Sequence, residues 1–264
     1  MKKIIALILA LCCVFLMISC GETTPPVDGT TPPAGDGTTP PAGDGTTPPV
    51  DETTAGIEAF KKLYSMSEPT KVVTTQVTDL GSVTLKGGST LVTGALNDGR
   101  TATVYTYSYE VLQSVQEGAG DVITPIMGTP ISGSREYVEG MGERYDGGEW
   151  DEEGFNFAPR AGFFGINLDA SKLVNCTYAS SGELQSLSFS VKAENVAAVF
   201  GESASQILSD VDVVITANSA VVTGISISYY EILIPEDEDL AYPEASVTIS
   251  TVYSYSIEKV TLTK

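Results

Sequence analysis

The stretch Thr101–Val115, TATVYTYSYEVLQSV, alternates between two kinds of side chain over most of its length. Odd-numbered positions carry large aromatic or aliphatic groups: Tyr105, Tyr107, Tyr109 and Val111. Even-numbered positions carry polar groups: Thr106, Ser108 and Glu110. Because successive side chains of a strand point to opposite faces of its sheet, this period of two predicts a half-buried strand with one tyrosine-rich face.

Most of the chain around this stretch is also rich in Val, Thr, Ser and Ile at alternating positions, which is typical of strands. The pattern predicts further strands over 71–80 and 82–96, with a turn at Lys86-Gly87-Gly88-Ser89 dividing the second run. It also predicts hairpins over 135–140/142–150 and 173–179/184–191, and three closing strands around 211–215, 225–229 and 247–257. We therefore expect eight to ten strands.

Two short segments have helical spacing instead. Ile57, Phe60, Leu63 and Tyr64 share one face of a helix that should end before Pro69, and 193–200 predicts a second helix closed by Gly201. A sheet of so many strands twists and curls, so the fold class is mainly β (α+β): a large, strongly curved antiparallel sheet or half-barrel with two or three short helices. Two apolar loops, 122–131 and 155–168, should either plug the core or act as lids over a cavity.

The N-terminus predicts the location of the protein. Lys2 and Lys3 precede the apolar run 4–18, which has the length of a signal-peptide core. Met17-Ile18-Ser19-Cys20 resembles the lipobox of bacterial lipoproteins, although Leu is usual where Met17 stands. The resemblance implies that Cys20 receives fatty acyl chains such as palmitate. The chain would then be anchored in the bacterial cell membrane, facing the extracytoplasmic side. An ordinary secretory signal or an uncleaved anchor are the alternatives, and both also export the remainder.

Residues 21–55 form a low-complexity segment in which Thr-Thr-Pro-Pro recurs at Thr23, Thr30, Thr38 and Thr46. Proline pairs favour extended polyproline II, so we expect a semi-flexible tether of at most roughly 100 Å. Its threonines could carry O-glycans, or its prolines could bind a partner domain, but a plain spacer is favoured. The predicted organisation is a signal peptide (1–20), a disordered tether (21–55) and one β-rich domain (56–264).

Composition excludes several function classes. The net charge of −20 argues against nucleic-acid binding, and the absence of histidine removes histidine-based catalysis and the common zinc sites. We find no nucleophile-elbow, P-loop or Cys-x-x-Cys motif, and we expect no enzyme activity, no cofactor, no metal and a monomeric chain. Cys176 is the one cysteine of the predicted domain; a small buried side chain is favoured over a reactive thiol.

The domain also resembles the LolA-like lipoprotein and lipid carriers. The resemblance lies in the opening helix 57–63, the hairpin that carries Tyr137, Tyr145 and Trp150, and the closing strand 247–255. It implies a curved antiparallel sheet wrapped on helices, with an apolar cavity for acyl chains.

Candidate ligand-binding residues are aromatic: Tyr105, Tyr107, Tyr109, Phe163, Phe164, Tyr229, Tyr253 and Tyr255. The alternative is that these tyrosines belong to a packed core. The acidic segments 146–153 and 236–239 have the oxygen ligands that suit Ca²⁺, but their spacing favours solvated loops. We therefore expect a non-catalytic carrier or sensor of an apolar or amphipathic ligand. The alternatives are a surface display or adhesion module with a packed interior, and a Ca²⁺-dependent hydrolase, which has less support.

Overall fold

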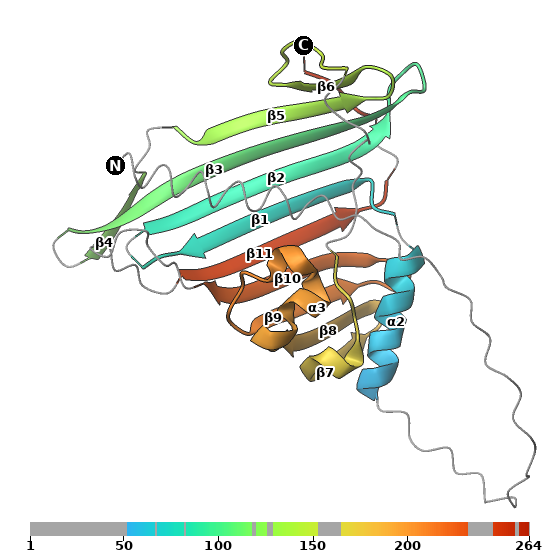
Figure 1. Cartoon of the computed structure of the whole chain (residues 1–264), viewed down its shortest axis with the longest axis vertical. Coiled ribbons are helices and arrows are strands. Elements are labelled where there is room, and N and C mark those ends of the chain that lie inside the picture. Colours follow the sequence, from blue (N-terminus) through green and yellow to red (C-terminus); the bar gives the residue numbers. More distant parts are fainter. Residues whose placement is uncertain are drawn as a thin grey trace, which may run out of the picture.

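The computed structural model describes residues 52–66, 68–81, 83–117, 120–125, 129–152, 165–231, 245–256 and 259–263. These residues build one antiparallel sheet of eleven strands (Figure 1). Ten strands follow the path β6-β5-β3-β2-β1-β11-β10-β9-β8-β7, and β4 adds to β3 beside that path. Within the described residues the sheet is twisted and does not close. The predicted mainly-β architecture, a large antiparallel sheet with short helices, is confirmed.

The strands are β1 (Lys71–Asp79), β2 (Val83–Ala95), β3 (Thr101–Glu117), β4 (Gly120–Pro125), β5 (Ile131–Val138), β6 (Gly142–Tyr145), β7 (Leu173–Ser181), β8 (Leu184–Val191), β9 (Val211–Ala217), β10 (Val222–Glu231) and β11 (Ala245–Ser254). The helices are α2 (Glu52–Met66) and α3 (Val196–Phe200). Three short 3₁₀ turns, η1 (Ala170–Lys172), η2 (Ala193–Asn195) and η3 (Glu202–Ala204), complete the described elements. Helix α2 begins at Glu52, so the last residues of the predicted tether, 52–55, are helical.

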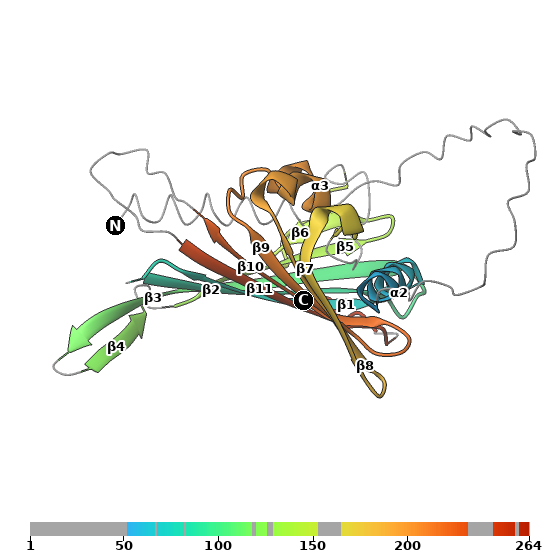
Figure 2. The same ribbon diagram turned by 90° about the horizontal axis from the view of Figure 1, so that it is seen from below.

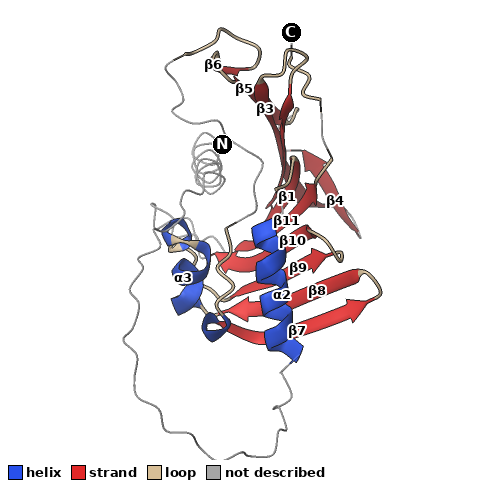
Figure 3. Cartoon of the chain, turned by 90° about the vertical axis from the view of Figure 1, so that its right-hand side faces the viewer, coloured by secondary structure: helices blue, strands red, loops and turns tan. Residues whose placement is uncertain are grey.

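The main hydrophobic core lies between the two helices and one half of the sheet. Helix α2 buries Ile57, Phe60 and Leu63 at the predicted spacing, and α3 buries Val196 and Val199. Strand β9 alternates fully, with Val211, Val213 and Ile215 buried and the residues between them exposed. Both helices lie beside strands β7–β10, and the strands from β1 to β6 extend past them (Figure 3).

A second, smaller core lies at the other end of the sheet. Ala102 of β3, Val138 of β5 and Val260 of the C-terminal segment are buried together, with Trp150 packed against them. Tyr105 lies on the helix side, so Ala102 and Val138, which are paired across β3 and β5, lie on the opposite face. The C-terminal segment therefore crosses the face that the helices leave open.

Two predicted loops are wrong in this part of the chain. The Lys86–Ser89 turn does not exist: β2 runs without interruption through Gly87 and Gly88, and its register against β1 and β3 is continuous. Residues 122–125 of the predicted loop 122–131 belong to β4, which pairs with the distal part of β3. Figure 2 shows β3 and β4 projecting beyond the rest of the sheet as a two-stranded ribbon. Strand β4 forms because its backbone pairs with β3. The local composition of 122–125 did not indicate a strand.

Candidate functional site

The six predicted tyrosines fall on one face of the sheet. Tyr105 pairs with Leu91, Leu91 with Val72, and Val72 with Tyr253, so these positions share a face across four strands. The register continues to β10, where Tyr229 pairs with Val247. This is the face that α2 and α3 cover over half of its width. The predicted tyrosine-rich face therefore exists, although its members have different surroundings.

Three of the tyrosines belong to the packed core. Tyr229 and Tyr253 are buried, and Tyr255 packs against the same cluster as Tyr64 of α2. The Tyr255 hydroxyl donates a hydrogen bond to the carbonyl of Val222, which is also buried. Burial, with the neighbouring Tyr253, raises the pKa of the Tyr255 hydroxyl above its usual range. These three side chains are structural, as the packed-core alternative predicts.

The other three, Tyr105, Tyr107 and Tyr109 on β3, form what we call the tyrosine ladder. All three are half-buried, and none is part of the main core that the described residues form. Their ring centroids are 5.9 Å apart between Tyr105 and Tyr107 and 5.7 Å apart between Tyr107 and Tyr109. The ladder thus presents three neighbouring rings along one strand.

The ladder rings lean over neighbouring strands at positions that have no side chain. A Cβ at Gly87 of β2 would come within 2.6 Å of the Tyr109 ring, and a Cβ at Gly133 of β5 would come within 2.5 Å of the Tyr107 hydroxyl. Glycine in a strand interior often marks such a close approach. The two glycines therefore let the rings lie down on the sheet, one on each side of β3.

Polar side chains separate the ladder from the core tyrosines. On β1 and β2 the same face carries Thr74, Gln76 and Ser89, and the hydroxyls of Thr74 and Thr251 are 3.2 Å apart. The predicted tyrosine surface is therefore two groups, one buried and one half-exposed. Of the six predicted tyrosines, only the three of the ladder remain candidates for ligand contact.

The second predicted lid, 155–168, is described from residue 165 onward. There Leu168 is buried in the main core, Ile166 packs against it, and the Asn167 amide donates to the carbonyl of Val199 at 2.8 Å. This end of the segment contributes to the core and does not form a lid. Phe163, Phe164 and Cys20 lie outside the described residues. Cys176 is half-buried, forms no disulfide and packs against the main core.

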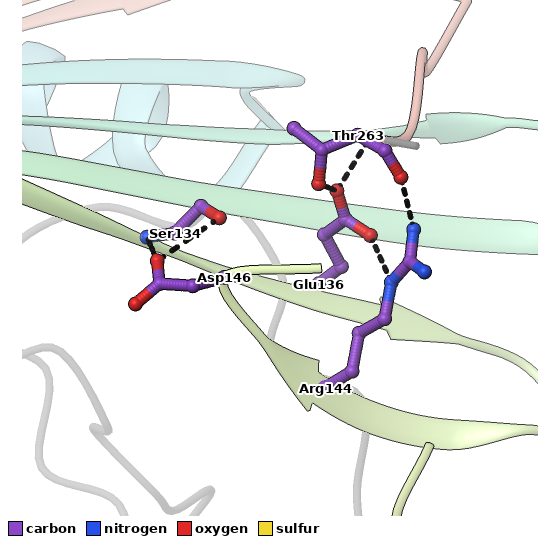
Figure 4. A network of polar contacts seen from close by, with 5 residues as sticks. All are labelled: Ser134, Glu136, Arg144, Asp146 and Thr263. Atoms are coloured by element: carbon purple, nitrogen blue, oxygen red, sulfur yellow. Dashed lines mark hydrogen bonds and ion pairs between the residues drawn. The ribbon is translucent and has the colours of Figure 1, made fainter. Parts of the chain in front are cut away.

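The acidic segment after β6 has a structural role at its first residue. The Asp146 carboxylate accepts a hydrogen bond of 2.6 Å from the Ser134 amide of β5 (Figure 4). Within the described residues, no group of three or more histidine, cysteine, aspartate or glutamate side chains is placed to hold a metal ion. The segment 236–239 lies outside those residues. In the same described part of the chain, no helix is long and apolar enough to cross a bilayer.

A charged clamp, which the sequence reasoning missed, joins the C-terminal segment to β5 and β6 (Figure 4). Glu136 is fully buried, and its carboxylate accepts hydrogen bonds from the amide and hydroxyl of Thr263. Its other oxygen pairs with the Arg144 Nε at 2.5 Å, and Arg144 also donates to the Thr263 carbonyl. Arg144 lies 4.8 Å from the centre of the Trp150 ring. The sequence did contain a signal for this ion pair, because Glu136 and Arg144 are opposite charges that face each other across the two arms of the predicted hairpin.

The clamp sets the ionisation of Glu136. Burial raises the pKa of this carboxyl, but the hydrogen bonds from Thr263 and the Arg144 charge outweigh burial and hold the pKa below its ordinary value. The carboxylate is therefore charged and fully engaged at neutral pH, with no free oxygen for a substrate. We assign the clamp a structural role.

Comparisons with known proteins give little further information. No family model and no curated protein matches the chain. Among solved structures, it is similar to a DUF1329 family protein from Desulfovibrio piger, with 7% identity and a TM-score of 0.25 over 79% of this chain and 95% of that one. It is also similar to a porin-like protein from Bacteroides uniformis, with 10% identity and a TM-score of 0.21 over 72% of this chain and 99% of that one. Superpositions this poor carry no argument about function.

Proposed function

We propose that this chain is a lipid-anchored, non-catalytic binding protein on the extracytoplasmic side of a bacterial membrane. Its tyrosine ladder holds an amphipathic ligand, such as an acyl chain with its headgroup, as a carrier or sensor would. The observation that carries the proposal is the placement of Tyr105, Tyr107 and Tyr109. They form a row of half-exposed rings on the apolar side of the sheet, beyond the core under α2 and α3.

The chemistry of tyrosine suits an amphipathic ligand. Each ring offers apolar area to a hydrocarbon chain, and each hydroxyl can hydrogen-bond to water or a headgroup at the same time. Burial of apolar area stabilises by about 25 cal/mol per Å², so three adjacent rings provide a useful contact strip without enclosing the ligand. The polar residues Thr74, Gln76 and Ser89 border this strip and would face the hydrated part of the ligand.

The lipid anchor and the location rest on the sequence alone. The lipobox-like Met17–Cys20 and the proline-rich tether support a domain that stands off the membrane surface. Two acyl chains on Cys20 would give stable anchoring, whereas one would bind only marginally.

One observation favours the second candidate, an adhesion or display module. Tyr229, Tyr253 and Tyr255 are packed against aliphatic residues, so the helix-covered half of the sheet has the filled interior which that module requires. Its partner, a protein or a glycan, would then bind the outer surface of the sheet.

Native mass spectrometry of the full chain, offered a bacterial lipid extract, separates the two candidates. A retained mass of lipid size that Tyr107→Ser removes supports the carrier. A protein mass that stays free of lipid supports the module.

A further inference from the structure

A hollow of about 550 Å³ lies over strands β1, β2 and β3. Gly88 stands at its centre, directly opposite Thr75 of β1 and Ser108 of β3 in the register. These positions alternate with Thr74, Gly87 and Tyr109, which share the face that the helices cover elsewhere. The hollow is therefore mainly on the opposite face of the sheet, and Tyr107 is the one ladder residue among its lining residues.

Packing does not require a glycine at position 88. A Cβ added there would meet only the Thr74 carbonyl oxygen, at an ordinary contact distance of 3.7 Å, and β2 has no bulge at this point. Glycine in a strand interior costs roughly 0.5–1 kcal/mol relative to alanine. Glycines inside strands often mark a bulge, a tight bend or the close approach of a ligand or another backbone, and β2 has no bulge here. The adjacent Gly87 is different, because the Tyr109 ring occupies its side-chain position.

The lining around Gly88 combines hydroxyl groups with apolar surface, to which Val73, Tyr107 and Pro130 contribute. Thr75, Thr106 and Ser108 line the hollow, and Lys86 and Glu110, which are paired in register across β2 and β3, stand at one end. Hydroxyls donate and accept hydrogen bonds, whereas the ammonium only donates and the carboxylate only accepts. Polar groups on a mainly apolar surface match a sugar, which carries hydroxyl groups at its edges and C–H groups on the faces of its rings.

The charge of this surface indicates a neutral ligand. On the same face of β1, β2 and β3, two lysines balance two acids: Lys71 and Lys86 against Asp79 and Glu110. The chain as a whole has a net charge of −20, so the neutrality is local. An anionic ligand would be repelled by the whole chain, and a cationic one finds no excess of carboxylates here.

The backbone groups argue against a peptide. Strands β1 and β2, and β3 over 106–108, are paired on both sides where they line the hollow, so the amides and carbonyls of these rows are engaged within the sheet. A peptide could not add as a strand at this place, which is its usual way to bind a sheet. We propose that the hollow over Gly88 is a binding site for a short neutral oligosaccharide. The hollow shares Tyr107 with the tyrosine ladder, but the proposal is argued from the hydroxyl groups, the charge balance and Gly88, and not from the lipid contact.

Titration calorimetry of the full chain in detergent, with short neutral glucans, mannans and galactans as probes, tests the site. We expect saturable binding of at least one probe and at least a tenfold loss of affinity in Gly88→Val, because the new side chain projects into the hollow beside the sugar. Ser226→Val is the matched control: Ser226 lies on the same face, on β10, outside the hollow, and this variant should bind as the wild type does.

A second variant keeps the test independent of folding. Glu110→Gln leaves the hollow open but replaces one acceptor oxygen of the carboxylate by an NH₂ donor and removes its charge, so it should weaken binding several-fold with an unchanged unfolding midpoint. Tyr105→Ser, on the ladder, should leave sugar binding unchanged, so loss of the lipid contact and loss of the sugar site can be told apart. The proposal is wrong if no neutral probe binds, if only anionic sugars bind, or if Gly88→Val binds as tightly as the wild type.

Discussion

The ring of Tyr109 occupies the space where Gly87 of the neighbouring strand would carry a side chain. A Cβ at Gly87 would come within 2.6 Å of the Tyr109 Cδ1 and Cε1 atoms, a distance that real Cβ atoms do not show. Tyr107 and Gly133 have the same relationship on the other side of β3. The orientation of the ladder therefore depends on two glycines that are far from it in sequence.

This contact predicts opposite outcomes for two adjacent glycines. Gly87→Ala should lower the free energy of unfolding by about 1–3 kcal/mol, because it forces the Tyr109 ring to move. Gly88→Ala should leave the free energy of unfolding unchanged or raise it by up to about 1 kcal/mol, because the space beside Gly88 is open and alanine restricts the unfolded chain. Urea unfolding of both variants measures the difference. Equal stability of the two would show that the ring does not lie over Gly87.

Loss of the Glu136 charge should weaken the clamp on the C-terminal segment. In Glu136→Gln the partly buried Arg144 loses its ion-pair partner, so we expect a loss of about 2–4 kcal/mol in the free energy of unfolding. The Thr263 amide, which donates to Glu136, should exchange its hydrogen faster. Glu183→Gln, an exposed carboxylate in the turn between β7 and β8, is the control and should change neither quantity. A stable Glu136→Gln variant with slow exchange at Thr263 would contradict the clamp.

The same carboxylate predicts how stability depends on pH. The pKa of Glu136 in the folded protein is below its ordinary value of 4.5, so its stabilising contribution is complete above that value. The contribution is lost as the pH falls through the lowered pKa, because protonation breaks the pair with Arg144. Thermal unfolding at pH values from about 7 to about 3 should therefore show a steeper acid loss for the wild type than for Glu136→Gln. Parallel curves would exclude Glu136 as a source of that loss.

The core role of Tyr255 predicts a hydroxyl-specific effect. Tyr255→Phe keeps the ring but leaves the buried Val222 carbonyl without this donor, so we expect a loss of about 1–2 kcal/mol in the free energy of unfolding. Tyr230→Phe is the matched control, since Tyr230 is 58% exposed on the other face of β10. Chemical denaturation of the two variants distinguishes them. An equal effect of both would argue against a structural hydroxyl at Tyr255.

The predicted lipid anchor is tested at Cys20. In a bacterial host, Cys20→Ser should remove incorporation of labelled palmitate and should move the protein from the membrane fraction to a detergent-free soluble or secreted fraction. Cys176→Ser is the control and should remain labelled, because its thiol lies in the folded domain. Continued labelling of Cys20→Ser would contradict the lipobox assignment.

The sequence predicted elements whose signal is local. Alternation of apolar and polar residues correctly predicted strands β3, β9, β10 and β11 and their buried faces. Helical spacing correctly predicted the opening helix and its buried residues Ile57, Phe60 and Leu63. Prediction failed at Gly87-Gly88, because a glycine pair is a strong local turn signal and the Tyr109 ring that compensates for it comes from another strand.

The dependence on contacts between distant segments also explains why the sequence alone could not define the candidate site. Period two placed the tyrosines on one face, but only the register shows that Tyr229 and Tyr253 lie under the helices and that the ladder lies beyond them. The clamp of Glu136 and Arg144 also needed the contact with Thr263, which is 127 residues away in sequence. Such long-range contacts are not encoded in a local pattern.

The most direct test of the central claim is a titration of the full chain, in a detergent-free buffer, with a fluorescent fatty acid. We predict saturable binding that Tyr107→Ser weakens at least tenfold. Tyr230→Ser, which changes an exposed tyrosine on the opposite face, should leave binding unchanged. Both variants must unfold at the wild-type midpoint or close to it for the comparison to count. Absence of binding by the wild type, or equal binding by Tyr107→Ser, would contradict the tyrosine ladder as a ligand surface.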